Sequence, residues 1–507
     1  MNMTKNMTKV KIDGDNVVST IGEGIFGTFV EHLGRSVYTG IYQPDHVTAD
    51  EDGFRGDVIA LTRKLRFSHI RWPGGNFVSG YDWKDAIGPK NERRARPDLA
   101  WAQIEPNEVG TAEFAKFCKK VGSEVMMAAN LGTGTPRDAA ELLEYCNFEK
   151  GTYYSDLRRR HGYESPFGIR RWCIGNEMDG PWQICMQTAD EYGRKALETA
   201  KMMKWLDPTI ELVATGSSGW LMPSCPEWDR KILEYTYSHV DYISLHRYYF
   251  CEDKNDRKKF NDFLCSSADM DRYIRAIVST ADYVKALKRG KKDIMLSFDE
   301  YNVWEDKAAD DHDLWTVGPR RQENIYDHAD ALVLASMMMT LIEHSDRVKL
   351  ACLAQLINAL GMIFTEPGRE GRSCLQTIAY PFLILRNCGG EKLLYQRTSG
   401  PLLQSEQYGE VSAVKTLASY NEESGQIRVF ALNLTAEKAQ VNLNISAFSK
   451  LRLVEKSEYI GNLKDKNVCG AEPCGIVRTA ENSVFEDGNG VVAVSPYSLT
   501  MFVFSVL

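Results

Sequence analysis

Between residues 24 and 385 the chain alternates strand-like and helix-like segments in a regular rhythm, and this alternation constrains the fold more than any other feature. The strand-like runs are Gly24–Val30, Ser68–Trp72, Glu124–Asn130, Arg171–Gly175, Glu211–Thr215, Tyr242–His246, Ile294–Asp299 and Lys349–Gln355. Helical spacing of apolar residues marks Asp57–Leu65, Thr111–Val121, Ala139–Cys146, Ala189–Trp205, Trp228–Tyr237, Met270–Leu287, Asn324–Glu343 and Gln376–Leu385. Eight strands, each followed by a helix or a long loop, predict a parallel sheet that closes into a (β/α)8 TIM barrel.

An open, doubly wound sheet would have the same periodicity. A dinucleotide-binding sheet of that kind usually carries a Gly-x-Gly-x-x-Gly turn after its first strand, and no such turn follows Gly24–Val30. Gly132-Thr133-Gly134 is better interpreted as a loop after the third strand. The barrel is therefore the favoured architecture, over residues 21–388.

The pattern changes after Gly389-Gly390, where short strands are separated by Asn, Gly, Ser and Glu turns without helical spacing. These strands are Val411–Tyr420, Ile427–Leu434, Ala439–Ile445, Leu451–Val454, Val491–Val494 and Leu499–Ser505. Residues 389–507 are thus predicted to form an antiparallel, jelly-roll-like β-sandwich, to which strands from residues 1–20 are expected to add. The sandwich could be a carbohydrate-binding module or a packing appendage.

The composition is that of a globular protein, with 43% hydrophobic and 26% charged residues. The balance of 61 Lys+Arg against 69 Asp+Glu lacks a basic cluster suited to nucleic acid, and Arg158-Arg159-Arg160 is interpreted as a solvated helix end. The N-terminus lacks the apolar core of a secretory signal, and no segment approaches the roughly 20 apolar residues of a membrane span. We therefore expect a cytoplasmic protein that binds neither nucleic acid nor membrane.

The twelve cysteines are scattered, which favours free thiols. Cys469 and Cys474 could form a local disulfide or half of a metal site, but no second Cys/His pair lies near them. We expect no metal and no cofactor.

Two of the strands end in a glutamate next to polar and aromatic residues. One ends in Asn176-Glu177, before an irregular Gly/Pro segment, and another ends in Asp299-Glu300. In a barrel of this type, functional residues gather at the carboxyl ends of the strands. The polar or aromatic residues at the other strand ends include Glu31, Arg71, Asn76, Asn130, His246, Tyr248 and Gln355. Each could have a purely structural role, and their occurrence together is what indicates a site.

This mixture of acidic, amide and aromatic groups suits a ligand rich in hydroxyls, because carboxylates and amides bind OH groups and indoles pack against sugar C–H faces. Two carboxyl groups flanking a glycosidic bond are also the minimum equipment for glycoside hydrolysis. One must be protonated to assist the leaving group, and the other must be ionised. His246 and Tyr248 could hydrogen-bond Glu300 and keep it ionised.

Four motifs extend this pattern: GNEMDGPWQ around Glu177, SFDEYNVW around Glu300, RWPGGNFVSGYDW at Arg71–Trp83 and LAWAQIEPNEVGTAEF at Leu99–Phe114. Together they resemble the family-51 glycoside hydrolases, mostly α-L-arabinofuranosidases. The resemblance runs in matching order from about Ile21 to Gln355.

The resemblance implies that Glu177 is the general acid/base and Glu300 the nucleophile of a retaining double displacement. It also implies that the substrate pocket is formed by Glu31, Arg71, Asn76, Trp101, Asn176, Tyr248, Trp304 and Gln355. Family members are commonly intracellular hexamers, so a homohexamer is expected. The expected substrate is a terminal α-L-arabinofuranosyl residue of arabinan or arabinoxylan oligosaccharides.

Two alternatives remain open. The first is a sibling activity on the same scaffold, such as an endo-β-glucanase, a xylanase or another furanosidase. The second is a sugar-binding protein without catalytic activity, against which the intact Glu177 and Glu300 argue.

Overall fold

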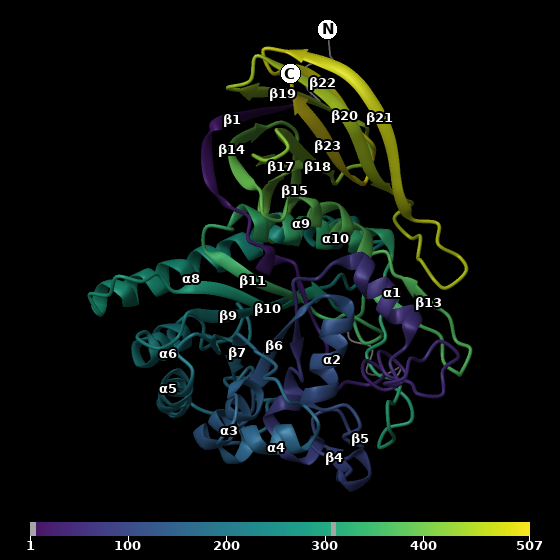
Figure 1. Ribbon diagram of the computed structural model, residues 1–507. Helices are drawn as coiled ribbons and strands as arrows, with labels where there is room; N and C mark the ends of the chain where they lie inside the picture. The colour runs from purple at the N-terminus through teal and green to yellow at the C-terminus, as the bar shows by residue number, and fades with distance from the viewer. Residues whose placement is uncertain (1–6, 306–310) are drawn as a thin grey trace.

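The computed structural model describes residues 7–305 and 311–507, which form a barrel below a large curled sheet (Figure 1). The barrel is closed by eight parallel strands in the order β10-β11-β2-β3-β6-β7-β8-β9. Their bounds are β2 (Gly27–Phe29), β3 (His69–Trp72), β6 (Glu124–Ala129), β7 (Arg171–Ile174), β8 (Glu211–Ala214), β9 (Tyr242–Tyr249), β10 (Met295–Val303) and β11 (Val348–Leu353). The predicted barrel is confirmed, and each expected strand overlaps one of these eight.

Helices cover the outside of the barrel (Figure 1). They are α1 (Gly56–Leu65), α2 (Thr111–Val121), α3 (Pro136–Asn147), α4 (Tyr153–Arg160), α5 (Ala189–Leu206), α6 (Glu227–Thr236), α7 (Arg257–Leu264), α8 (Ser267–Leu287), α9 (His328–Glu343) and α10 (Ala379–Leu385). Several start at a side-chain cap: Thr135 accepts from the Asp138 N–H, and Thr188 accepts from the Glu191 N–H. Helix α9 is buried almost throughout, because it lies between the barrel and the curled sheet.

Helix α4 corrects the prediction of a solvated basic helix end at Arg158, whereas Arg160 is exposed as expected. Arg158 is completely buried, and its guanidinium donates to the carbonyl oxygens of Tyr145, Phe148, Glu149 and Tyr163. The last carbonyl groups of a helix lack partners within the helix, and Arg158 satisfies that of Tyr145 in the last turn of α3 and that of the C-cap residue Phe148. A run of charged residues in the sequence does not show that one of them lies against unpaired carbonyl groups at the end of a neighbouring helix.

The second sheet has nine strands in the order β21-β20-β23-β18-β17-β14-β1-β19-β22. Their bounds are β1 (Met7–Thr20), β14 (Lys392–Ser399), β17 (Val414–Asn421), β18 (Gln426–Asn433), β19 (Ala439–Ser446), β20 (Lys450–Ile460), β21 (Gly475–Glu486), β22 (Asn489–Val494) and β23 (Ser498–Val506). The sheet curls so that β22 also contacts β18 and β23, and inward-facing residues of all nine strands share one core. This is the predicted β-sandwich, in which β14, the whole of β21 and the part of β20 after Val454 were not anticipated.

Strand β1 places the segment Met7–Thr20 inside the C-terminal sheet. It pairs antiparallel with β14 (Val10 opposite Thr398) and parallel with β19 (Val10 opposite Leu443). In Figure 1 it is the purple strand among green and yellow ones.

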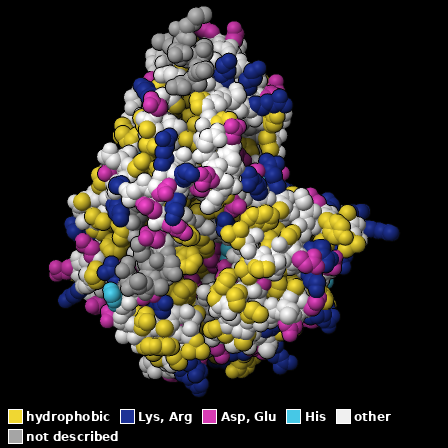
Figure 2. Space-filling model, turned by 180° about the vertical axis from the view of Figure 1, so that it is seen from behind, with side chains coloured by type: hydrophobic (Ala, Val, Ile, Leu, Met, Phe, Trp, Pro, Cys, Tyr) yellow, Lys and Arg dark blue, Asp and Glu magenta, His cyan; other side chains and the backbone are white. Residues whose placement is uncertain are grey.

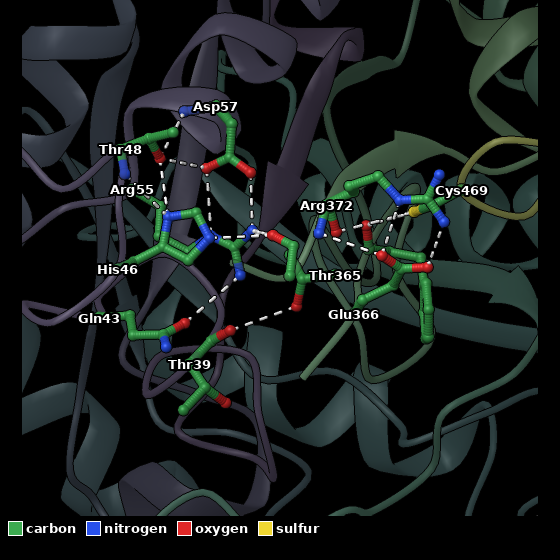
Figure 3. A network of polar contacts seen from close by, with 12 residues as sticks. Thr39, Gln43, His46, Thr48, Arg55, Asp57, Thr365, Glu366, Arg372 and Cys469 are labelled. Atoms are coloured by element: carbon green, nitrogen blue, oxygen red, sulfur yellow. Dashed lines mark hydrogen bonds and ion pairs between the residues drawn. The ribbon is translucent and has the colours of Figure 1, made fainter. Parts of the chain in front are cut away.

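Three short hairpins complete the structure: β4 (Arg96–Asp98) with β5 (Gln103–Glu105), β12 (Ile363–Thr365) with β13 (Ser373–Leu375), and β15 (Leu402–Ser405) with β16 (Gly409–Ser412). A polar network anchors the β12–β13 hairpin to the segment after β2 (Figure 3). Buried Arg55 pairs with Asp57 and donates to the Gly371 carbonyl, while Thr365 Oγ1 donates to the Thr39 carbonyl at 3.2 Å. The network holds the hairpin that follows Gln355.

Each of the twelve cysteines lies within the described residues and is a free thiol. Cys469 Sγ faces the β12–β13 hairpin, 3.7 Å from the Arg372 carbonyl oxygen, and the two cysteines of the CGAEPC segment are not bonded to each other. Among the described residues, no helix combines the length and apolar character that a membrane span requires.

Candidate active site

Glu177 and Glu300 lie close together at the carboxyl end of the barrel. Glu177 comes shortly after β7, at a backbone φ of 45°, and Glu300 lies opposite His246 in the β9–β10 ladder. His246 Nδ1 is 2.9 Å from Glu177 Oε1 and 3.6 Å from Glu300 Oε2. One oxygen of each carboxyl group lies within 4.8 Å of the other. This proximity matches the pairs of retaining glycosidases (about 5 Å) rather than those of inverting ones (about 6.5–9.5 Å).

The Glu300 carboxylate is held from two sides. Arg71 Nη1 donates to its Oε1 at 2.8 Å, and Tyr248 Oη donates to its Oε2 at 2.8 Å. Arg71 is fully buried on β3 and also donates through Nη2 to Asn176 Oδ1 at 2.7 Å. Asn176 Nδ2 has no hydrogen-bond partner among the described residues, so it can donate to a ligand hydroxyl.

The surroundings shift the two carboxyl groups in opposite directions. Burial raises the pKa of Glu177, and the hydrogen bond and charge of His246 only partly offset this effect. Burial acts on Glu300 too, but the charges of His246 and Arg71 and the hydrogen bonds from Arg71 and Tyr248 outweigh it and lower the Glu300 pKa. Glu177 is therefore the better proton donor, and Glu300 is the group kept ionised.

A third buried carboxyl group, Glu31, lies at the end of β2. Its Oε1 accepts from the Phe77 backbone N–H and from Trp101 Nε1, both at 2.9 Å, while the Glu31 N–H donates to Gln355 Oε1 at 2.9 Å. Burial, followed by the charge of Glu300, raises the pKa of Glu31 to about 8. With this raised pKa, Glu31 can donate as well as accept a hydrogen bond at neutral pH. The backbone at Gly75 lies so close that a Cβ on Gly75 would be 2.7 Å from Glu31 Oε2.

The remaining residues predicted for the site lie around these groups. The Trp304 ring packs edge-on against Tyr248 at 5.4 Å between ring centroids, and Trp304 Nε1 donates to Gln322 Oε1. Asn76 directly follows Gly75 and begins the 3₁₀ helix Asn76–Gly80. The structure thus brings all eleven predicted residues to one end of the barrel, on six of its strands or the loops that follow them.

Two features were not included among the predicted site residues. Trp182, with 52% of its surface exposed, donates from Nε1 to Glu177 Oε2 at 2.7 Å. Trp182 lies within the sequence motif around Glu177, so the sequence alone could have identified it as a site residue. Beneath Glu300, the buried Asp299 accepts from Cys173 Sγ at 3.4 Å and lies 3.9 Å from Arg71 Nε. No local pattern marks this contact, because Cys173 and Asp299 are 126 residues apart.

Glu177, His246 and Glu300 form a cluster whose geometry could accept a cation. However, all four carboxyl oxygens already accept hydrogen bonds, from His246, Trp182, Arg71 and Tyr248. A cation would have to displace at least one of these donors beside the Arg71 guanidinium. The donor set therefore suits proton transfer better than metal binding.

Figure 2 shows a hollow on the face opposite that of Figure 1, with acidic side chains inside it and hydrophobic ones around its rim.

A closed eight-stranded barrel with two adjacent carboxyl groups of opposite pKa shift, at the ends of the fourth and seventh strands, defines a glycoside hydrolase. Residues 61–263 match the model of the α-L-arabinofuranosidase 1 domain, and residues 299–498 match that of the α-L-arabinofuranosidase C-terminal domain. The chain belongs to the α-L-arabinofuranosidases of glycoside hydrolase family 51.

Individual proteins show the same relationship. The chain is 46% identical to an intracellular exo-α-(1→5)-L-arabinofuranosidase of Acetivibrio thermocellus, over 95% of this chain and 96% of that one. It is 47% identical to the intracellular exo-α-(1→5)-L-arabinofuranosidase 1 of Bacillus subtilis, over 88% of each chain. A family 51 α-L-arabinofuranosidase structure from Bifidobacterium longum aligns over 99% of this chain and 100% of that one, with a TM-score of 0.92 and 36% identity.

Proposed function

We propose that this protein is a retaining, exo-acting α-L-arabinofuranosidase that releases terminal non-reducing α-L-arabinofuranosyl residues from arabinan or arabinoxylan oligosaccharides. The observation that carries the proposal is the adjacent pair Glu177 and Glu300 with opposite pKa shifts. Residues 21–388 would be the catalytic domain. Residues 389–507, together with residues 1–20, would form a packing domain.

In the first step, a Glu300 oxygen attacks the anomeric carbon while Glu177 gives its proton to the glycosidic oxygen. The bond between the sugar and the leaving group breaks, and a covalent arabinosyl-enzyme forms. The raised pKa of Glu177 supports its role as acid, and the donors on Glu300 support its ionised state.

In the second step, Glu177 is ionised and takes a proton from a water molecule, whose oxygen attacks the same carbon. The Glu300–sugar bond breaks, so two inversions leave the configuration of the sugar unchanged. Loss of the Glu177 proton is favoured at this stage, because esterification of Glu300 removes a neighbouring negative charge that raises the Glu177 pKa.

Glu31, Gln355 and Trp101 form a linked wall that suits recognition of one furanose ring, with Asn76, Asn176 and Trp304 as further contacts. Three relatives at 46–47% identity carry exo-α-(1→5) in their descriptions, which supports the 1,5 linkage as the first to test. A xyloglucanase of family 44 also aligns, but at 13% identity and a TM-score of 0.61 it shares only the fold.

The same relatives are described as intracellular, and we propose a cytoplasmic location on that basis. A homohexamer remains a prediction, which light scattering coupled to size-exclusion chromatography tests directly.

The decisive experiment is hydrolysis of 4-nitrophenyl α-L-arabinofuranoside, β-D-galactofuranoside, β-D-xyloside and β-D-cellobioside, with proton NMR identifying the anomer released first. We expect rapid turnover of the arabinofuranoside and initial release of the α-anomer. Preferred turnover of the cellobioside or xyloside would favour the sibling endo-activities. Initial release of the β-anomer would contradict retention, and binding without turnover would indicate a sugar-binding protein.

A further inference from the structure

Strand β10 carries two adjacent carboxyl groups, Asp299 and Glu300, and both lie beside the same guanidinium. Neighbouring side chains of a regular strand point to opposite faces of the sheet. Here, however, three steps along β10 from Ser297 to Glu300 match two steps on β9. The same mismatch occurs against β11, between Phe298 and Tyr301. An extra residue of this kind, a β-bulge, re-aims the side chains of its strand, which accounts for the shared direction of the two carboxyl groups.

The guanidinium is that of the fully buried Arg71, on β3. Its Nη1 donates to Glu300 Oε1 at 2.8 Å, and its Nε lies 3.9 Å from Asp299 Oδ2. Among the described residues, these are the two carboxyl groups within ion-pair distance of Arg71. One buried positive charge is therefore shared between two buried carboxyl groups.

Asp299 is held in the barrel interior by uncharged donors. Ser297 Oγ donates to its Oδ1, and Cys173 Sγ on β7 donates to its Oδ2 at 3.4 Å. Strands β7 and β10 are not neighbours in the barrel, so the second contact crosses the interior. Burial raises the pKa of the Cys173 thiol, which keeps it a neutral donor. In the described part of the chain, Arg71 is the one cation within ion-pair distance of Asp299.

Arg71 is oriented by contacts other than Asp299. Its Nη2 donates to Asn176 Oδ1 at 2.7 Å, and its Cζ lies 4.7 Å from the centroid of the Phe29 ring. The 3.9 Å between Arg71 Nε and Asp299 Oδ2 is too long for a hydrogen bond. Asp299 therefore acts on Arg71 as a charge rather than as a hydrogen-bond acceptor.

The proposed reaction changes the charges around Arg71. When a Glu300 oxygen bonds to the anomeric carbon, the carboxylate becomes a neutral ester, and the Glu177 proton passes to the leaving oxygen. The negative charge then lies on Glu177, whose carboxyl group contacts His246 rather than Arg71. A buried cation that loses its counter-charge is strongly destabilised. In this state Asp299 is the carboxylate that remains beside Arg71.

We propose that Asp299 is a positioning residue that acts through Arg71, as a permanent counter-charge that keeps the guanidinium paired while Glu300 is esterified. Because Asp299 shares the charge of Arg71, it also prevents Glu300 from being stabilised too strongly as a carboxylate to attack the sugar. The inference rests on the proposed function, since it assigns a role in the covalent step at Glu300.

Two neutral variants test this role. Asp299→Asn removes the negative charge with little change in size, and Asp299→Ser is a smaller alternative should the amide not fit beside Cys173. The matched control is Asp57→Asn, at a carboxyl group of α1 that pairs with the fully buried Arg55 at 2.7 Å. Thermal unfolding establishes which variants are folded.

The pH dependence of kcat/KM distinguishes a counter-charge from a structural support. The Asp299 carboxylate opposes the ionisation of Glu300, so its removal should lower the Glu300 pKa. We expect the acidic limb for 4-nitrophenyl α-L-arabinofuranoside to move down by about one pH unit in both neutral variants, and the plateau to fall about tenfold. Asp57→Asn should leave the limb at the wild-type pH.

If Asp299 only supported the position of Arg71, its loss would withdraw the guanidinium from Glu300 and move the limb to higher pH. That movement, or an unchanged limb, would overturn the inference. The other ionisable groups that face this cluster are His246 and Tyr248 on β9, Glu177 after β7, Glu31 after β2, Cys173 on β7 and Cys352 on β11. All of them are present in the variants, so the direction of the shift reports on Asp299.

Carbon NMR separates this inference from the proposed function, because it needs no turnover. In protein labelled at the glutamate side-chain carboxyl carbons, the signal that disappears in Glu300→Gln reports the Glu300 pKa in the free protein. A lower Glu300 pKa in Asp299→Asn than in the wild type supports the shared charge, even if none of the tested glycosides is hydrolysed. An equal or higher pKa would refute it.

Discussion

At the scale of single residues, two chemically identical side chains acquire different properties from their neighbours. Glu177 contacts one ionisable donor, His246, and the indole of Trp182, so burial dominates and its pKa rises. Glu300 contacts a buried guanidinium and a phenol, in addition to lying near His246, and its pKa falls. A difference in donors, rather than in burial, separates the proposed acid from the proposed nucleophile.

Replacing Glu300 by Ala removes the proposed nucleophile while leaving Arg71 and Tyr248 in place. We expect kcat on 4-nitrophenyl α-L-arabinofuranoside to fall by about four orders of magnitude or more, because no covalent intermediate can form. Stopped assays of purified protein measure this, with Glu51→Ala at an exposed carboxyl group as the control. Activity near the wild-type level would remove Glu300 from this role.

Replacing Glu177 by Ala should affect substrates according to their leaving groups. A nitrophenyl group needs little acid assistance, so the arabinosyl-enzyme should still form and then accumulate until added azide releases it. The wild-type kcat/KM should rise with pH as Glu300 ionises and fall as Glu177 loses its proton. The raised pKa of Glu177 sets the pH at which the wild-type kcat/KM falls. The Glu177→Ala variant has no such proton to lose, so its kcat/KM should not fall at alkaline pH. Equal damage to good and poor leaving groups in the first step would contradict the acid/base role.

At the scale of elements, the position of Glu177 depends on how its loop is tied down. Asp179, two residues further along, accepts from the Ser218 N–H at 3.0 Å and from Ser224 Oγ at 2.9 Å. These contacts join the loop after β7 to the loop after β8. The left-handed backbone at Glu177 therefore gains support from a neighbouring loop rather than from its own strand.

Asp179→Ala should release this link and let the Glu177 carboxyl group move. We expect kcat/KM to fall by about tenfold to a hundredfold for arabinobiose, and much less for the nitrophenyl glycoside, since only poor leaving groups need a well-placed acid. Asp179→Asn keeps one acceptor and should recover part of the loss. Equal losses on both substrates would show that the link has a general structural role.

At the scale of the whole molecule, an N-terminal strand belongs to the sheet that the C-terminal part of the chain completes. Strand β1 lies between β14 and β19, so its removal would divide the nine-stranded sheet and expose the side of the core around Val10 and Ile12. The sheet in turn packs on α9 and α10 of the barrel (Figure 1). The first strand therefore contributes to the stability of both parts.

Deleting residues 1–20 should lower the unfolding midpoint strongly or leave the protein insoluble, because two rows of backbone hydrogen bonds and a buried apolar stripe are lost. Differential scanning calorimetry measures the unfolding midpoint. A 21–507 chain that unfolds at the wild-type temperature would show that β1 is dispensable.

The sequence by itself determined the repeating elements and the strand ends that carry Glu177 and Glu300, because both depend on short-range periodicity and on turn residues adjacent in the chain. Tertiary structure alone decided which glutamate keeps its proton, since Arg71 reaches Glu300 across 229 residues. It also buried Arg158 beneath a helix end and inserted β1 into a distant sheet. These properties depend on desolvation and on partners far apart in the chain, which no local pattern contains.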